Sequence, residues 1–206
     1  MRTMFPDLGA GMLRLARLLC VAGAVALTGC ASFYVDASTK EVSAAQFKKP
    51  AELKPVQLLF EFQTKGTQNS RATDFLKAQV AEQVKISGLF SQVSDGPVTG
   101  GALLSVTLNN VPLSDDAFAK GFVTGLTFGL AGSQVSDGYV CTVKYVNGSQ
   151  TPLAKTARHA IHTSMGATGG QPTGTKADNM EAAVRTMTRQ VVSTALNDLS
   201  QDPSFK

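Results

Sequence analysis

The sequence predicts an α+β domain of two layers, in which a mostly antiparallel sheet is packed by two helices. Two observations support this prediction. Several segments alternate apolar and polar residues, as strands do, and two segments repeat apolar residues every three to four positions, as helices do. Their order is β-α-β-β-(Gly-rich insert)-β-β-α. Chains with such an order bury their helices against a sheet, so we expect one domain over residues 56–200.

The first half of this domain contains a clear strand and a clear helix. VQLLFEFQ, which begins at Val56, alternates apolar and polar residues. The loop GTQNS then offers Asn69 or Ser70 as a helix N-cap, and Gly88 is expected to end the helix. LFSQV and ALLSVTLNNV are the next two strand candidates. The buried face of the helix is expected to hold Leu76, Val80 and Val84.

The second half is expected to hold a hairpin and the longer helix. YVCTVKYVNGSQTPLAKTARHAIHTS predicts two strands around Asn147-Gly148, a common pair in hairpin turns. Asp178 and Glu181 have the spacing of a capping box for the helix that follows. One face of that helix is expected to hold Met180, Val184, Met187, Val191, Ala195 and Leu199.

Residues 1–29 have the pattern of a bacterial signal peptide. Arg2, Arg14 and Arg17 give a basic start, and LLCVAGAVAL is an apolar run too short to span a bilayer alone. LTGC, which ends at Gly29 and Cys30, resembles the lipobox of bacterial lipoproteins. The resemblance implies cleavage between Gly29 and Cys30, and diacylglycerol and N-acyl lipid on Cys30. An ordinary signal peptide, or a buried N-terminal helix with an incidental thiol, is the alternative.

The lipobox resemblance also implies a location. In that family an aspartate directly after the cysteine retains the protein at the inner membrane, whereas Ala31 follows here. We therefore expect a lipid-anchored protein of the outer membrane, on its periplasmic face, held by more than one acyl chain. Residues 30–55 show no sustained period and are expected to be a flexible tether. The last residues, QDPSFK, are expected to fray.

Composition argues against several kinds of partner and site. The formal net charge is +4, and no cluster of basic residues alternates with aromatic residues, so nucleic acid is not expected. His159 and His162 would point to opposite faces of a strand, so no shared metal is expected, and we expect both at the surface or an edge. Cys141 lies in an alternating strand pattern and is expected to be a buried small hydrophobe.

No catalytic residue is predicted. The sequence has no GxSxG motif, and no P-loop or GxGxxG motif to bind phosphate. Asp115 and Asp116 form a pair of carboxylates, but a role at the start of the segment that follows explains them without catalysis. We therefore expect a non-enzymatic protein with no cofactor apart from the covalent lipid on Cys30.

AFAKGFVTGLTFGLAGS, residues 117–133, is the expected insert. As a helix it would align small residues at every fourth position, a pattern that lets helices approach closely in a membrane. As a strand it would separate bulky from small residues, and a third alternative is that it packs on the domain's own sheet. The glycines serve close packing in each case. The candidate interaction residues are Gly121, Phe122, Gly125, Leu126, Phe128 and Gly129.

The element order, with SGLFSQV after the first helix and then ALLSVTL, resembles a group of envelope lipoproteins. These share the fold of the TolB N-terminal domain and include the penicillin-binding-protein activator LpoB and the curli-secretion lipoprotein CsgG. The resemblance implies a periplasmic protein-interaction module with an envelope partner or self-association. One alternative is a subunit of an oligomeric envelope pore or secretion apparatus that uses the insert for assembly or membrane contact. Another is a binder of a small apolar ligand or peptidoglycan fragment.

Overall fold

The computed structural model describes residues 31–113, 134–165 and 174–206. Two α-helices are found there, α2 (Ser70–Ile86) and α4 (Met180–Ser200), with a short 3-10 helix, η1 (Ala44–Gln46). The strands are β1 (Ala31–Val35), β2 (Pro55–Thr64), β3 (Thr67–Gln68), β4 (Gln92–Ser94), β5 (Ala102–Pro112), β6 (Gln134–Val146), β7 (Leu153–Met165) and β8 (Thr175–Ala177).

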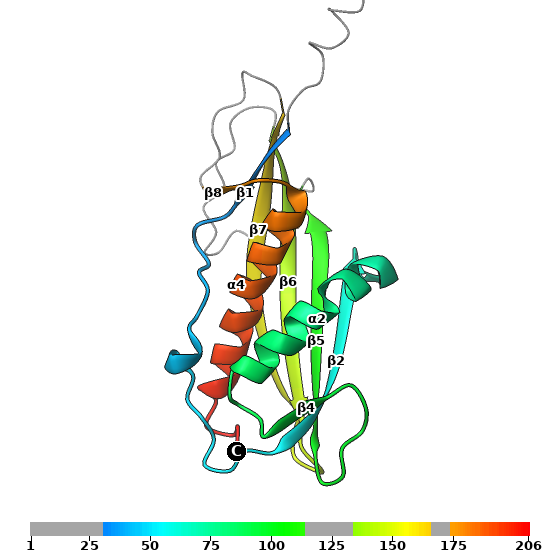
Figure 1. The fold of residues 1–206 in the computed structure, drawn as a ribbon, viewed down its shortest axis with the longest axis vertical. Coiled ribbons are helices and arrows are strands. Elements are labelled where there is room, and N and C mark those ends of the chain that lie inside the picture. The colour runs from blue at the N-terminus through cyan, green and yellow to red at the C-terminus, as the bar shows by residue number, and fades with distance from the viewer. Residues whose placement is uncertain (1–30, 114–133, 166–173) are drawn as a thin grey trace, which may run out of the picture.

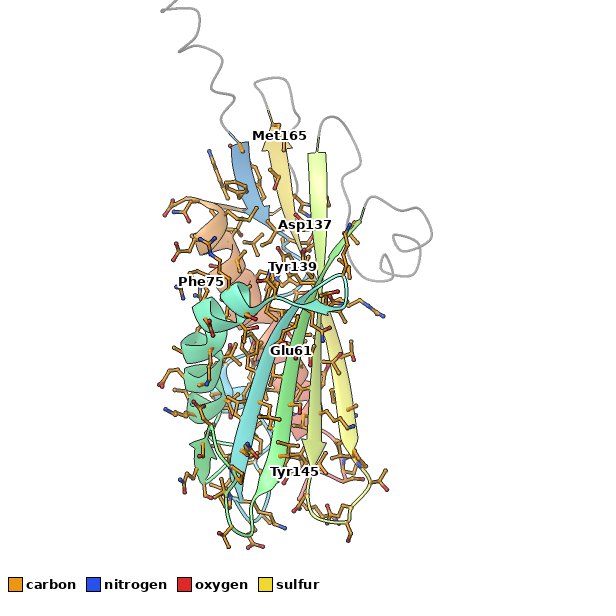
Figure 2. The ribbon with its side chains drawn as sticks, turned by 90° about the vertical axis from the view of Figure 1, so that its right-hand side faces the viewer. Glu61, Phe75, Asp137, Tyr139, Tyr145 and Met165 are labelled. Carbon is orange, nitrogen blue, oxygen red and sulfur yellow. The ribbon has the colours of Figure 1, made fainter. Side chains whose placement is uncertain are left out.

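These strands form one sheet, and both helices pack on it (Figure 1). The strand order is β3-β2-β5-β6-β7-β1-β8, with β4 beside β2. β2 runs parallel to β5 and β4, and the other neighbouring pairs are antiparallel. The predicted α+β fold of two layers, with a mostly antiparallel sheet, is therefore confirmed. Figure 2 shows the molecule from the side of β2.

The core lies between the sheet and the two helices. Register places Leu104, Val106 and Leu108 of β5 opposite core-facing residues of β6, and alternation along each strand directs them all to the helix side. The predicted apolar faces of both helices are buried there, except that Met180 and Val184 are only partly covered. Fully buried helix residues include Leu76, Val80, Val84, Met187, Val191, Ala195, Leu196 and Leu199.

The helix starts follow from local hydrogen bonds. Of the two predicted N-cap candidates for α2, Asn69 occupies the position, and its Oδ1 accepts from the backbone N–H of Ala72 at 3.1 Å. For α4 the prediction of Asp178 is wrong, because Asn179 occupies the N-cap and its Oδ1 accepts from Ala182 N–H at 2.8 Å. An asparagine and an aspartate cap equally well, so the sequence pattern could not choose between neighbours.

The predicted tether over residues 30–55 is wrong for the part that the structure describes. β1 pairs with β7 and β8, and the residues that follow it run alongside α4 (Figure 1). Val42 N–H donates to Ser193 Oγ at 2.9 Å and Lys48 N–H donates to Ser200 Oγ at 3.2 Å. Phe47 is buried in the main core. Serine hydroxyls on α4 thus accept hydrogen bonds from the backbone N–H groups of a segment whose sequence shows no apolar periodicity.

The C-terminal residues also pack on the domain, so the prediction of a frayed tail is wrong. The Phe205 ring is buried and lies 5.0 Å from the Tyr145 ring and 6.0 Å from the Phe90 ring, between centroids. Asp202 forms an ion pair with Lys155 at 2.7 Å. A single aromatic side chain near the end of a chain gives no periodic signal, although it can fix that end in place.

Candidate functional site

The residues that the sequence assigned to lipidation and interaction lie outside the described residues. They are Gly29, Cys30 and the six candidates between Gly121 and Gly129, and the acidic pair Asp115-Asp116 lies outside as well. The structure does describe the residues that flank them. These flanking residues show where the chain enters and leaves the sheet on either side of the stretches that hold the candidates.

The flanking residues meet at one end of the sheet. Ala31 on β1 pairs with Met165 on β7, and the neighbouring residue of β7, Ser164, pairs with Gln134 on β6. β1 and β6 therefore lie on either side of β7, about 10 Å apart at the spacing of hydrogen-bonded strands. The chain also leaves β5 here. We call this the Ala31 end of the sheet, defined by Ala31, Leu113, Gln134 and Met165.

A chain of three polar side chains lies near the Ala31 end. His162 on β7 stands between Asp36, which follows β1, and Ser136 on β6. Its Nε2 lies 3.1 Å from Asp36 Oδ2 and its Nδ1 lies 2.8 Å from Ser136 Oγ. Asp36 also accepts from the backbone N–H of Ser38 at 2.8 Å and from the Ser38 hydroxyl. Only 1% of Asp36 and 2% of His162 is exposed.

The Asp36 carboxyl is held in its charged form. Burial alone would raise its pKa, but the hydrogen bonds with His162 and Ser38 outweigh that effect and leave the pKa below the usual value. A buried carboxylate of this kind depends on its donors, because an unpaired charge in the interior is costly. The Asp36–His162–Ser136 chain therefore links β1, β7 and β6 through one buried charge.

These three residue types also occur in serine hydrolases, but their arrangement differs. In a hydrolase triad the serine bonds histidine Nε2 and the carboxylate bonds Nδ1. Here Ser136 bonds Nδ1 and Asp36 bonds Nε2, the reverse order. The arrangement gives each of these buried polar side chains a hydrogen-bond partner. We assign it the role of fixing β1 to its neighbours.

His159 lies on the helix side of β7. Its Nδ1 accepts from Ala160 N–H at 2.8 Å, so Nε2 carries the proton and donates to Gln190 Oε1 on α4 at 2.6 Å. Burial lowers its pKa, and the hydrogen bond with Gln190 opposes this effect only in part. The prediction that His159 and His162 occupy a surface or an edge is wrong, because both are buried. Their expected placement on opposite faces agrees with their separate partners on α4 and β6.

The prediction for Cys141 is confirmed. The side chain is fully buried in the core, and burial raises the pKa of its thiol to about 12. A thiol of this kind is protonated and inert at neutral pH. Within residues 31–113, 134–165 and 174–206, no group of three or more His, Cys, Asp or Glu side chains could hold a metal ion. No helix in those same ranges is long and apolar enough to cross a membrane.

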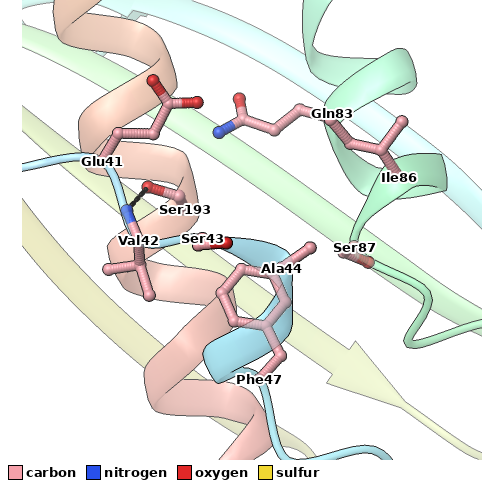
Figure 3. Close-up of a pocket in the computed structure, with 9 residues that line it drawn as sticks. All are labelled: Glu41, Val42, Ser43, Ala44, Phe47, Gln83, Ile86, Ser87 and Ser193. Carbon is pink, nitrogen blue, oxygen red and sulfur yellow. Dashed lines mark hydrogen bonds between the residues drawn. The ribbon is translucent and has the colours of Figure 1, made fainter.

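A cleft of about 390 Å³ lies between the N-terminal segment and the two helices (Figure 3). Val42 and Phe47 approach from that segment, Gln83 and Ile86 from α2, and Ser193 from α4. Gln83 Nε2 donates to Arg189 O at 2.6 Å, while its Oε1 is buried without a partner among the described residues. The lining is mostly neutral, with Glu41 as its one charged residue, and it contains no histidine or cysteine.

Sequence reasoning missed Asp36 and Ser136. Asp36 lies within the expected tether, and Ser136 lies just after the expected insert. One signal was available in TARHAIHTS, where apolar and polar residues are mixed on both faces of an expected strand. A strand covered on both faces has this loss of alternation.

Comparison with known proteins found no family model and no curated relative that matches the chain. Among solved structures, the PelC dodecamer from Paraburkholderia phytofirmans is similar, with 13% sequence identity over 86% of this chain and 100% of that chain, at a TM-score of 0.34. A minor lipoprotein from Acinetobacter baumannii is also similar, with 15% identity over 74% of this chain and 91% of that chain, at a TM-score of 0.33. Similarity at this level assigns neither a family nor a function.

Proposed function

We propose that this chain is a non-enzymatic lipoprotein of the bacterial outer membrane, which acts as a protein-interaction module on the periplasmic face. Diacylglycerol and an N-acyl chain on Cys30 hold it to the bilayer. The signal-peptide pattern of residues 1–29 and the LTGC sequence support the anchor. An envelope protein or a second copy of the chain is the partner.

One structural observation carries the proposal further than the sequence could. Ala31, the residue after Cys30, pairs with Met165 as the first residue of β1. A lipid on Cys30 would therefore be attached directly to the sheet, with no tether between them. The Ala31 end would face the bilayer, and the opposite end of the sheet would point into the periplasm.

The Ala31 end also favours a second candidate function, a subunit of an oligomeric envelope pore or secretion apparatus. The glycine-rich stretch lies in the connection between β5, which ends at Pro112, and β6, which begins at Gln134, and both of these strand ends are at the Ala31 end. In the proposed orientation its two attachment points are near the membrane. That position suits contact with the bilayer or with neighbouring copies.

The anchor is tested by metabolic labelling with palmitate and by the mass of the N-terminal peptide, in the unchanged chain and in Cys30→Ser. Cys141→Ser is the matched control, because its thiol is buried and should carry no lipid. We expect label in the unchanged chain and in Cys141→Ser, and none in Cys30→Ser. An unlabelled native chain, or a label that persists in Cys30→Ser, contradicts the proposal.

The second candidate is tested by analytical ultracentrifugation of the lipidated protein in mild detergent, with Gly125→Leu alongside. A discrete ring-sized oligomer that Gly125→Leu disrupts, with unchanged circular dichroism, favours the pore subunit. A monomer in both forms favours the interaction module and excludes assembly through the glycine-rich stretch.

A further inference from the structure

The outer edge of β2 has a gap between two short strands. β5 pairs with β2 along residues 56–64, but on the other side β4 pairs only with residues 55–57 and β3 only with residues 63–64. Within the described residues no strand pairs with that side of positions 58–62, which we call the β2 gap. Figure 2 looks onto this edge, with Glu61 labelled on β2. A sheet edge of this kind is a template for an added strand.

The backbone of the β2 gap is oriented for such pairing. Phe62 N–H donates to Thr73 Oγ1 at 2.9 Å, and Phe62 O accepts from Asn69 N–H at 2.8 Å, so both groups point away from β5. Backbone groups of alternate residues point to the same side of a strand. The N–H and C=O of Phe60 therefore also point to the open edge, where they can bond an added strand.

A cleft lies along the same positions. Its volume is about 440 Å³, and residues 58–61 of β2 line it together with Thr73 of α2 and Thr107 of β5. Leu59 is 46% exposed and provides an apolar contact. Since both edge groups of Phe62 already have partners, the open stretch covers residues 58–61, about 13 Å of extended chain, which can take a short extended peptide.

The charge of the cleft is acidic. Glu61, Asp74 and Asp95 line it with one basic residue, Lys77, whose Nζ lies 2.9 Å from Asp95 Oδ2. Within the described residues no cation pairs with Glu61 or Asp74. Glu61 lies on β2 and Asp74 on α2, so the two carboxylates approach an added strand from different sides.

We propose that the β2 gap binds an extended, basic peptide segment of a partner protein by strand addition. Phe60 provides the main-chain hydrogen bonds, Leu59 contacts an apolar side chain, and Glu61 and Asp74 each pair with a lysine or arginine. The acidic edge also opposes pairing between two copies of this chain, because like charges would meet. This inference names a partner class for the proposed interaction module and does not depend on the lipid.

The test uses the full chain in detergent and a fluorescent seven-residue peptide that alternates lysine with valine and is blocked at both ends. Anisotropy measures binding, and hydrogen exchange measures protection of the Phe60 amide. We expect saturable binding together with slower exchange at Phe60. Binding that leaves Phe60 exchange unchanged is attraction of charges alone and overturns strand addition. Protection that rises with protein concentration, without peptide, assigns the edge to a second copy and also overturns the proposal.

Charge variants provide the second test. The double variant Glu61→Gln, Asp74→Asn should weaken peptide binding by about fivefold, the combined effect of two exposed ion pairs. The matched control is Glu82→Gln, Asp178→Asn, which removes the same charge from exposed positions outside the cleft and should change binding by less than about twofold. Equal weakening in both overturns the proposal. Cys30→Ser should bind the peptide as the native chain does, so failure of the lipid anchor and failure of this site are distinguishable.

Discussion

The two faces of the sheet bury their residues by different means. On the face under α2 and α4, apolar side chains from strands and helices form one large cluster, and the polar group His159 is neutral and bonded to an amide. On the opposite face, near the Ala31 end, burial centres on the charged Asp36 and its bonds to His162 and Ser38. β7 contributes a histidine to each face.

This difference shows where the stability of the fold depends on packing and where it depends on individual hydrogen bonds. An apolar cluster spreads its free energy over many contacts, so one truncation leaves a cavity but keeps the others. A buried charge depends on a few donors, and the loss of one leaves a group unsatisfied. We therefore expect the Asp36 side to be the more sensitive to single substitutions that keep volume nearly constant.

The largest expected effect is from Asp36→Ala. It leaves His162 and the Ser38 N–H without their acceptor and should lower the free energy of unfolding by about 3 kcal/mol, the upper end of the cost of a buried group left unsatisfied. Urea unfolding followed by circular dichroism measures it. Asp178→Ala, at an exposed position, is the control and should change little. Equal stability of the two variants would remove the distinction drawn between the faces.

Phe205→Ala tests the helix side. Its ring packs on Tyr145 and Phe90, and its removal should cost about 2 kcal/mol, at the low end for a buried ring because the chain end can adjust. The same unfolding measurement applies. Lys206→Ala is a control at the exposed neighbour. A loss below that of the control would mean that this end of the chain does not contribute to the core.

The dependence of stability on pH tests the environment of His159. His159 has a lowered pKa in the folded chain, so the unfolded chain, with a value near 6.5, takes up the proton first. Stability should be full well above pH 6.5 and should fall progressively as the pH drops from about 7 to about 5, because protonation then favours the unfolded chain. Thermal unfolding across this range measures the fall. His159→Gln should flatten it, and an unchanged slope would assign the effect to another group.

Ser193→Ala should have the smallest effect, about 1 kcal/mol, because Val42 N–H would lose its acceptor at a partly covered position. Hydrogen exchange should be faster at Val42 than in the native chain. Thr194→Ala, whose hydroxyl bonds only Gln190 O of its own helix, is the neighbouring control. Unchanged exchange at Val42 would show that the N-terminal segment is held by its other contacts.

The periodic elements could be predicted from sequence, and the reason is physical. β5 and α4 alternate or repeat their apolar residues over many positions, and each buries one face. The N-cap Asn69 and the buried Cys141 followed from the same patterns. β1 could not be predicted, because it is short and its partners on β7 and β8 are distant in sequence.

The candidate sites were less predictable than the fold. The Asp36–His162–Ser136 chain joins residues separated by more than a hundred positions, and it exists only once β1 pairs with β7. The β2 gap likewise depends on how far β3 and β4 extend, which no local pattern determines. Sequence patterns report the face that a residue occupies, whereas these sites depend on register.

The position of β1 has a mechanical consequence. Its antiparallel pairs with β7 run from Ala31 to Val35, and Ala31 is at the very end of the sheet. A pull on Ala31 along the strand axis, away from the sheet, loads these hydrogen bonds together in shear, whereas a sideways pull would open them one after another. Force transmitted through a lipid on Cys30 would thus be resisted by all the hydrogen bonds between β1 and β7 at once. The buried bond between Asp36 and His162 would add to this resistance.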